Sequence, residues 1–251
     1  MVSHHDSGRL EVGVVRYAKL TVLVACSAIF ASDFAAADED GFAVDANIVT
    51  GIDFSRSINE HESELQIYGM VQAIRAPEVL RAIENGPRGR IGFAVFLWAS
   101  GTFPELASWR VIGSQQDAEE ASTEILLRLQ LMLDTSRRHS VGSLTNVSAA
   151  MAHAGDMLDD SPYASKRAIV NIVGNGKDNV GEGPRWSRDA LVARGATING
   201  VVIGGDRKIS EYYREEVIGG PTAFVLAADT PDEMVKAFTS KFVSEITLNV
   251  R

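Results

Sequence analysis

Apolar runs alternate with amphipathic segments along most of the chain. Runs rich in β-branched and aromatic residues occur at 44–53, 90–100, 167–174, 197–204 and 222–228. Several are apolar almost throughout, which is typical of strands covered on both faces in a largely parallel sheet. A sixth run, "SWRVIG" at 108–113, is the weakest, and we expect it to be an edge strand.

Helical patterns fill the intervals between these runs, because apolar side chains recur at helical spacing in 59–75, 116–133 and 230–246. The apolar positions are Ile67, Val71 and Ile74 in the first segment, Ile125, Leu126, Leu129 and Met132 in the second, and Met234, Phe238, Phe242 and Ile246 in the third. Strands that alternate with helices, without a second compositional regime, predict one α/β domain with right-handed crossovers.

Two proline-containing stretches set helix boundaries. The segment 75–90 has the pattern of a helix broken at Pro77, followed by a glycine- and proline-rich turn into the next strand. Asp229 or Thr230 can cap the last helix, with Pro231 tolerated in its first turn.

Residues 1–37 have the order of a secretory signal peptide. A basic start is followed by the apolar "LTVLVACSAIFA" and then by small residues that end at Ala37, before an acidic "DEDG". The apolar run is shorter than the ~20 residues of a membrane span. We therefore expect cleavage after Ala37, an acidic linker at 38–43, a domain at 44–251, and export to the periplasm or beyond. "LVAC" also resembles a lipoprotein processing box, which would make Cys26 a lipidated N-terminus; an uncleaved anchor is a third alternative.

Composition narrows the classes of function. The chain is 45% hydrophobic and 23% charged, as in a globular protein, and its net charge of -9 argues against a nucleic-acid partner. Cys26 is the only cysteine, so the mature chain is expected to have no disulfide, thiolate zinc site or cysteine nucleophile.

Three predicted strand ends carry oxygen-bearing side chains. Asp53, Ser55 and Ser57 alternate after the first strand, so they converge if the chain stays extended there. Thr145 lies at the mouth of a helix, and Asn175 follows the fourth long strand. Hard oxygen ligands favour Mg²⁺, Mn²⁺ or Ca²⁺ over zinc. Asp178, three residues after Asn175, is either an accessory ligand or a solvated turn residue.

Simpler interpretations exist for the same residues. Ser57 can cap the following helix in a box with Glu60, and Asn175-Gly176 can be an ordinary turn. The histidines at 61, 139 and 153 are scattered and are expected to be surface or packing residues. Among the tryptophans, Trp186 in the polar loop "EGPRWSRD" is the candidate interface anchor.

The segment "DFSRS" resembles the D-x-S-x-S signature of von Willebrand factor type A (vWA) domains, the metal-ion-dependent adhesion site (MIDAS). The similarity covers residues 44–246, and the stretch from "YYREEVIGG" to "FVSEI" is similar to a bacterial exported subfamily of unknown function. The resemblance implies a Rossmann-like three-layer sandwich: a mostly parallel sheet with one short antiparallel edge strand and helices on both faces.

The resemblance also implies a metal site. Ser55, Ser57 and Thr145 would hold the cation, Asp53 and the third-loop residue would act largely through bound waters, and a protein partner would supply an acidic ligand. Asn175 stands where the family has an aspartate, so the site has less anionic charge and weaker expected affinity.

We therefore expect a non-enzymatic, exported interaction domain that uses Mg²⁺, Mn²⁺ or Ca²⁺. One alternative is a metal-independent scaffold with a degenerate site, and another is a metal-assisted hydrolase. The sequence contains neither a G-x-S-x-G elbow nor a G-x-x-x-x-G-K-[ST] loop, which disfavours the enzyme.

Overall fold

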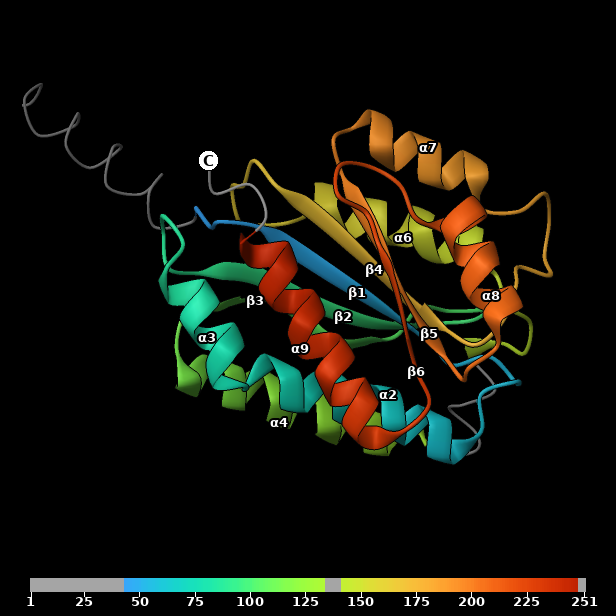
Figure 1. The fold of residues 1–251 in the computed structure, drawn as a ribbon, viewed down its shortest axis with the longest axis horizontal. Helices are drawn as coiled ribbons and strands as arrows, with labels where there is room; N and C mark the ends of the chain where they lie inside the picture. The colour runs from blue at the N-terminus through green and yellow to red at the C-terminus, as the bar shows by residue number, and fades with distance from the viewer. Residues whose placement is uncertain (1–42, 134–140, 248–251) are drawn as a thin grey trace, which may run out of the picture. The chain divides into compact units, whose positions relative to one another are not determined.

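The computed structural model describes residues 43–133 and 141–247 and contains a six-stranded sheet in the order β3-β2-β1-β4-β5-β6 (Figure 1). The strands are β1 (Asn47–Asp53), β2 (Ile91–Trp98), β3 (Glu105–Ile112), β4 (Ala168–Gly174), β5 (Thr197–Ile203) and β6 (Val225–Ala228). All neighbouring pairs are parallel except β2 and β3. This confirms the mostly parallel sheet with an antiparallel edge strand.

Helices cover both faces of the sheet (Figure 1). One face carries α2 (Glu60–Ile74), α3 (Pro77–Glu84), α4 (Gln115–Met132) and α9 (Pro231–Thr247). The other carries α6 (Val147–Asp159), α7 (Arg185–Ala193), α8 (Arg207–Tyr212) and the π-helix η1 (Tyr213–Val217). The arrangement is the expected three-layer α/β sandwich.

Each helical layer packs on its own hydrophobic cluster. Ile48 and Ile52 of β1 contribute to the cluster beneath α2 and α9, whereas Val49 contributes to the one beneath α6. Successive side chains of a strand point to opposite faces, and both faces of β1 are buried. Both clusters are built from residues between 46 and 246, so this part of the chain has a core of its own.

Some predicted boundaries were wrong. The edge strand begins at Glu105 rather than at 108 and has eight residues, because the small and apolar residues at 106 and 107 are buried against the sheet. Leu126 was expected on the buried face of α4 but is 43% exposed. The boundaries at Pro77 and Pro231 are confirmed as helix starts, and Thr230 caps α9 by accepting from the Glu233 N–H at 3.3 Å.

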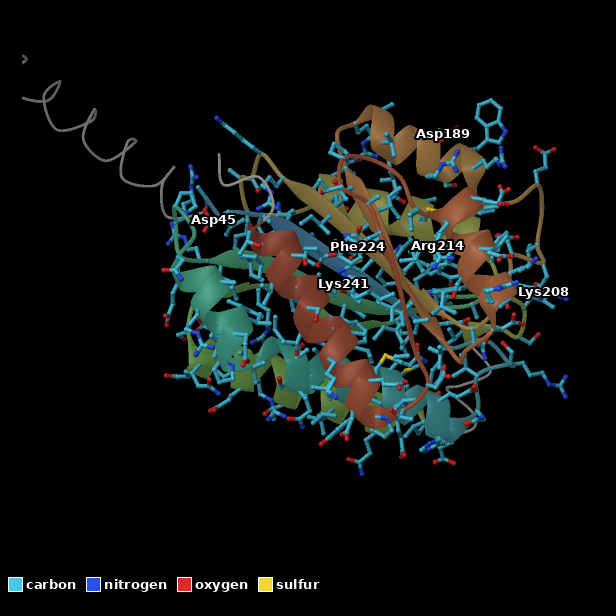
Figure 2. The ribbon with its side chains drawn as sticks, viewed as in Figure 1. Asp45, Asp189, Lys208, Arg214, Phe224 and Lys241 are labelled. Carbon is cyan, nitrogen blue, oxygen red and sulfur yellow. The ribbon has the colours of Figure 1, made fainter. Side chains whose placement is uncertain are left out.

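A buried polar network fastens α9, on which Figure 2 labels Lys241, to the sheet. Lys241 and Glu245, one turn apart and almost wholly buried, form an ion pair at 2.5 Å. The Glu245 carboxylate also accepts from the Asn199 side chain at 2.6 Å and from that of Asn171 at 3.5 Å, and Asn171 donates to Thr50 Oγ1 at 3.2 Å. Two adjacent strands, β4 and β5, thus supply polar partners for one helix, and Asn171 links them to the neighbouring strand β1.

Several expectations fall outside the described residues. They are the signal peptide at 1–37, the linker up to residue 42, lipidation at Cys26, and the role of His139. Within 43–133 and 141–247, no helix combines the length and apolar character needed to cross a membrane.

Candidate metal centre

The candidate site lies where β1 ends, at the carboxyl edge of the parallel strands. The strand order reverses at β1, which has β2 on one side and β4 on the other. Crevices outside the carboxyl ends of strands at such a switch point are the usual ligand positions in open α/β sheets. Asp53 is the last residue of β1, opposite Trp98 of β2, and its side chain is fully buried.

The loop after β1 folds back on the Asp53 carboxylate. The Ser55 N–H donates to Asp53 Oδ1 at 2.8 Å, and Phe54 between them in sequence is buried in the core. The hydroxyls of Ser55 and Ser57 lie 3.0 Å apart. Their alternate spacing therefore brings both serines to one side, close to Asp53.

The predicted cap of α2 by Ser57 is wrong. Asn59 caps the helix instead, accepting from the Glu62 N–H at 2.9 Å, while Glu62 Oε2 accepts from the Asn59 N–H at 3.0 Å. This reciprocal capping box lies two residues further along the chain than expected. It leaves the Ser57 hydroxyl available to the candidate site.

Thr145 reaches the site from the loop before α6. Its hydroxyl donates to Ser55 Oγ at 3.4 Å, and its side chain is buried. Asn179 holds the backbone of Thr145 from two directions: its Oδ1 accepts from the Thr145 N–H at 2.9 Å, and its own N–H donates to the Thr145 carbonyl at 2.9 Å. This role of Asn179 was not predicted, although the polar stretch "GNGKDN" contains the residue.

Asn175 closes the site from the end of β4. Its Oδ1 accepts from the Ser57 hydroxyl at 2.9 Å, and its Nδ2 lies 3.4 Å from the Ser57 carbonyl oxygen as a donor. The amide thus bridges two strand-end loops through both of its polar atoms. The structure therefore brings Asp53, Ser55, Ser57, Thr145 and Asn175 into one cluster.

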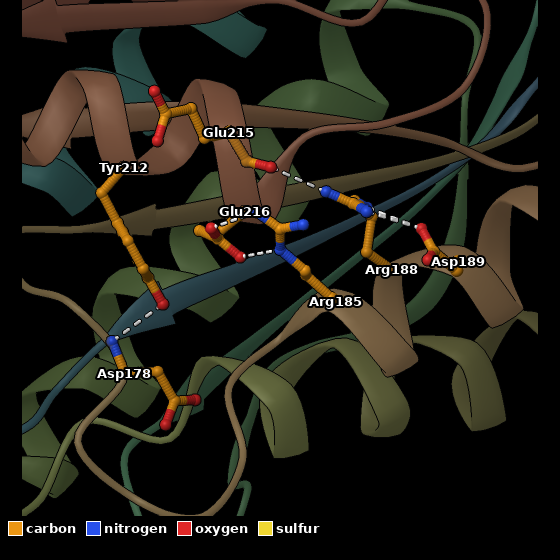
Figure 3. A network of polar contacts seen from close by, with 7 residues as sticks. All are labelled: Asp178, Arg185, Arg188, Asp189, Tyr212, Glu215 and Glu216. Carbon is orange, nitrogen blue, oxygen red and sulfur yellow. Dashed lines mark hydrogen bonds and ion pairs between the residues drawn. The ribbon is translucent and has the colours of Figure 1, made fainter.

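Asp178 lies outside this cluster. Its two carboxylate oxygens accept from the N–H groups of Ser148 and Val180 at 3.0 and 2.9 Å. Its own N–H donates to the Tyr212 hydroxyl at 3.1 Å (Figure 3). These contacts fix the loop at the start of α6 and do not replace the charge that Asn175 lacks.

The electrostatics of Asp53 follow from its burial. Loss of solvent raises its pKa from 3.8 to about 6. The nearby N–H groups of Ser55 and Asn175 and the Ser55 hydroxyl lower the pKa, but their effect is smaller than that of burial. Oδ2 makes no hydrogen bond of normal geometry with the described residues. An ionised carboxylate buried with a free oxygen is costly without a compensating charge.

These groups fit a hard divalent cation. A buried carboxylate with an unused oxygen lies beside a chain of hydroxyls and an amide oxygen, which are the donor types that Mg²⁺, Mn²⁺ and Ca²⁺ accept. In the described part of the chain no three His, Cys, Asp or Glu side chains cluster as a metal site. A cation here would therefore be held largely by neutral oxygens.

The other singled-out side chains lie apart from this cluster. His61 is exposed on α2, and His153 stacks on Phe103 at 4.7 Å between ring centroids. Trp98 is buried, whereas Trp186 is 78% exposed at the start of α7. Trp186 borders a groove of about 490 Å³, shared with Asn146 and the loop at 180–183.

Comparisons with known proteins identify the family and the fold of the chain. A family model described as "Protein of unknown function (DUF1194)" matches residues 43–250. A search of curated proteins gives no match.

Solved structures with the same fold include proximal thread matrix protein 1 from the mussel byssus, at 18% identity and a TM-score of 0.54, covering 81% of this chain and 48% of that one. A second structure of that protein, at 17% identity and a TM-score of 0.52 over 80% and 48% of the two chains, has a zinc-occupied MIDAS motif. A von Willebrand factor type A protein from Catenulispora acidiphila matches at 16% identity and a TM-score of 0.55, over 81% and 43% of the two chains. The chain thus spans about half the length of the mussel protein, and the likeness establishes the vWA fold.

Proposed function

The chain belongs to the DUF1194 family and has a vWA fold, and from this premise we propose that it is an exported, non-enzymatic interaction domain. It binds a protein partner through a divalent cation, Mg²⁺ or else Mn²⁺ or Ca²⁺, at Asp53, Ser55, Ser57, Thr145 and Asn175. The observation that carries this proposal is the meeting of the Ser55, Ser57 and Thr145 hydroxyls beside a buried carboxylate, one oxygen of which has no hydrogen-bond partner among the described residues.

The low charge of the site gives the partner a defined role. Asp53 is the one carboxylate of the cluster, because Asn175 contributes a neutral amide and Asp178 binds elsewhere. A divalent cation held by one carboxylate keeps net positive charge. A partner that supplies an aspartate or glutamate to the cation would therefore add a large share of the binding energy.

The surface beside the site supports an acidic partner. Arg56 and Lys177 are exposed on the two loops that carry Ser57 and Asn175. Neither side chain forms an ion pair with another described residue. Two positive charges at the rim would attract an acidic segment and raise its association rate.

Calorimetry tests the metal site. Residues 38–251, which contain both hydrophobic clusters, would be titrated with Mg²⁺ and Mn²⁺. We expect binding by the wild type at millimolar cation or below, and none by Asp53→Ala. Absence of binding by the wild type, or equal binding by the variant, would contradict the proposal.

One observation favours a second candidate, a scaffold that needs no metal. The Ser57–Asn175 hydrogen bonds already join the two loops without a cation. Pull-downs from an envelope extract with and without a chelator separate the candidates. The partners of a scaffold survive chelation, whereas those of a metal-dependent site are lost.

A further inference from the structure

Two buried oxygens at the candidate site lack hydrogen-bond partners in the described structure. One is Asp53 Oδ2 and the other is the Tyr213 hydroxyl. Both residues are fully buried. An unsatisfied buried polar group costs about 1–3 kcal/mol, so two such groups in one place need an explanation.

The two oxygens face the same small space above Gly174. A Cβ atom at Gly174 would lie 2.8 Å from the Tyr213 hydroxyl and 2.9 Å from Asp53 Oδ2. Any residue larger than glycine would therefore push the two groups apart. The end of β4 thus leaves an open path between the tyrosine and the carboxylate.

The local fold around Tyr213 is specialised to deliver this hydroxyl. Tyr213 begins the π-helix η1, a rare geometry that occurs often at functional sites. Its ring crosses β5 over Gly200, where a Cβ atom would lie 2.8 Å from Tyr213 Cδ1. Glycines on two neighbouring strands and a π-helix together place one phenol beneath the candidate cation site.

We propose, on the basis of the metal site proposed above, that the Tyr213 hydroxyl is a positioning group of that site. It donates a hydrogen bond to Asp53 Oδ2 when a cation is bound. This contact holds the carboxylate in one orientation toward the hydroxyls of Ser55 and Thr145.

The chemistry of the two groups suits this pairing. Burial raises the pKa of Tyr213 well above its ordinary value, so the phenol keeps its proton and can donate at every physiological pH. A hydrogen bond to an ionised group is worth more than one between neutral groups. The described structure lacks this hydrogen bond, so forming it when a cation orients the carboxylate would favour the cation-bound state.

The test removes the hydroxyl alone. Tyr213→Phe keeps the ring over Gly200, and Tyr212→Phe is the matched control, because its hydroxyl contacts the Asp178 N–H instead (Figure 3). Residues 38–251 of each variant would be titrated with Mg²⁺ and Mn²⁺, and urea unfolding would be followed in EDTA.

We expect Tyr213→Phe to raise the cation Kd about tenfold or more. Its metal-free unfolding midpoint should stay at the wild-type value or rise, because an unsatisfied hydroxyl has been removed. Tyr212→Phe should bind the cations within about twofold of wild type. If the hydroxyl had only a structural role, Tyr213→Phe would lower the unfolding midpoint in EDTA. Weaker cation binding with an unchanged or raised midpoint therefore identifies a role in the metal site.

Three outcomes overturn the inference. Wild-type affinity in Tyr213→Phe would show that the hydroxyl takes no part, and equal weakening in both variants would indicate general loosening of the loops. A Tyr213→Phe protein that unfolds at a lower midpoint in EDTA would assign the hydroxyl to the fold. In each of these cases the wild type still binds cation, so the proposed function stands; absence of wild-type binding would overturn both.

Discussion

Replacing Asp53 by asparagine should stabilise the metal-free protein while abolishing its response to metal. The substituted amide would keep an oxygen acceptor for the Ser55 N–H but would carry no charge. Burial raises the folded-state pKa of Asp53 from 3.8 to about 6. At 1.36 kcal/mol per pKa unit, keeping this buried group ionised at pH 7 costs the folded state about 3 kcal/mol.

The sign of the pH dependence follows from this raised pKa. Below pH 3.8 the carboxyl is neutral in both the folded and unfolded states, and its full contribution to stability is present. As the pH rises to about 6, the unfolded chain has released its proton while the folded chain retains it, so the free energy of unfolding falls. About half of the roughly 3 kcal/mol is lost by pH 5 and nearly all of it by pH 7.

Urea unfolding in EDTA between pH 5 and 8 measures this difference. We expect the free energy of unfolding of Asp53→Asn to exceed that of the wild type by up to about 3 kcal/mol at pH 7 and by roughly half as much at pH 5. Added Mg²⁺ should raise the stability of the wild type and leave the variant unchanged. Parallel pH profiles for the two proteins in EDTA would refute the buried, perturbed carboxylate on which the reasoning depends.

Four further predictions concern single positions. Asn175→Asp should tighten Mg²⁺ binding about tenfold by adding a carboxylate, and unchanged affinity in calorimetry would place position 175 outside the cation's shell. Thr145→Val should weaken Mg²⁺ binding, whereas Thr145→Ser, which keeps the hydroxyl, should retain it; equal affinity of both variants would exclude a hydroxyl role. Lys241→Met should lower the free energy of unfolding by about 3–5 kcal/mol because it leaves Glu245 charged and buried, and adding Glu245→Gln should restore much of the loss in urea unfolding. Trp186→Ser should leave both the unfolding midpoint and the Mg²⁺ affinity unchanged, since the indole is exposed, while reducing chelator-sensitive partner capture; undiminished capture would exclude it as an anchor.

The architecture could be predicted from the sequence because the burial of a strand is reflected in its composition. Both faces of β1 and β2 are covered, so β2 is apolar throughout and β1 is largely apolar, and both runs are easily recognised. The short helices α7 and α8 and the π-helix η1 were not predicted. They have few buried residues, such as Leu191 alone in α7, and so they leave little periodic signal.

The sequence could predict which residues gather at the candidate site, but only some of the contacts that they make there. Asp53, Ser55 and Ser57 are close in sequence, and the strand-end rule brings Thr145 and Asn175 to the same edge. Which donor each polar side chain selects depends on loop geometry. The sequence could not show that the Asp178 carboxylate would be held by the N–H groups of two other loop residues.

Tyr213 was missed for a different physical reason. In the sequence it is one aromatic residue in a C-terminal stretch, and its proximity to Asp53 depends on a π-helix together with Gly174 and Gly200 on two strands. None of these three features has a strong signal in a single sequence. Their relation appears only when the chain is folded.

Without a cation, the polar groups buried at the site destabilise the folded state more than apolar or amide side chains in the same places would. Its buried carboxylate has a raised pKa and an unpartnered oxygen, and a fully buried phenol beside it also lacks a partner in the described structure. An apolar or amide side chain at either position would relieve the cost. Proteins keep such arrangements where function opposes stability, and a cation would satisfy both groups together: it favours the ionised Asp53, which then accepts from Tyr213. The destabilised free state is therefore the physical reason to expect a bound one.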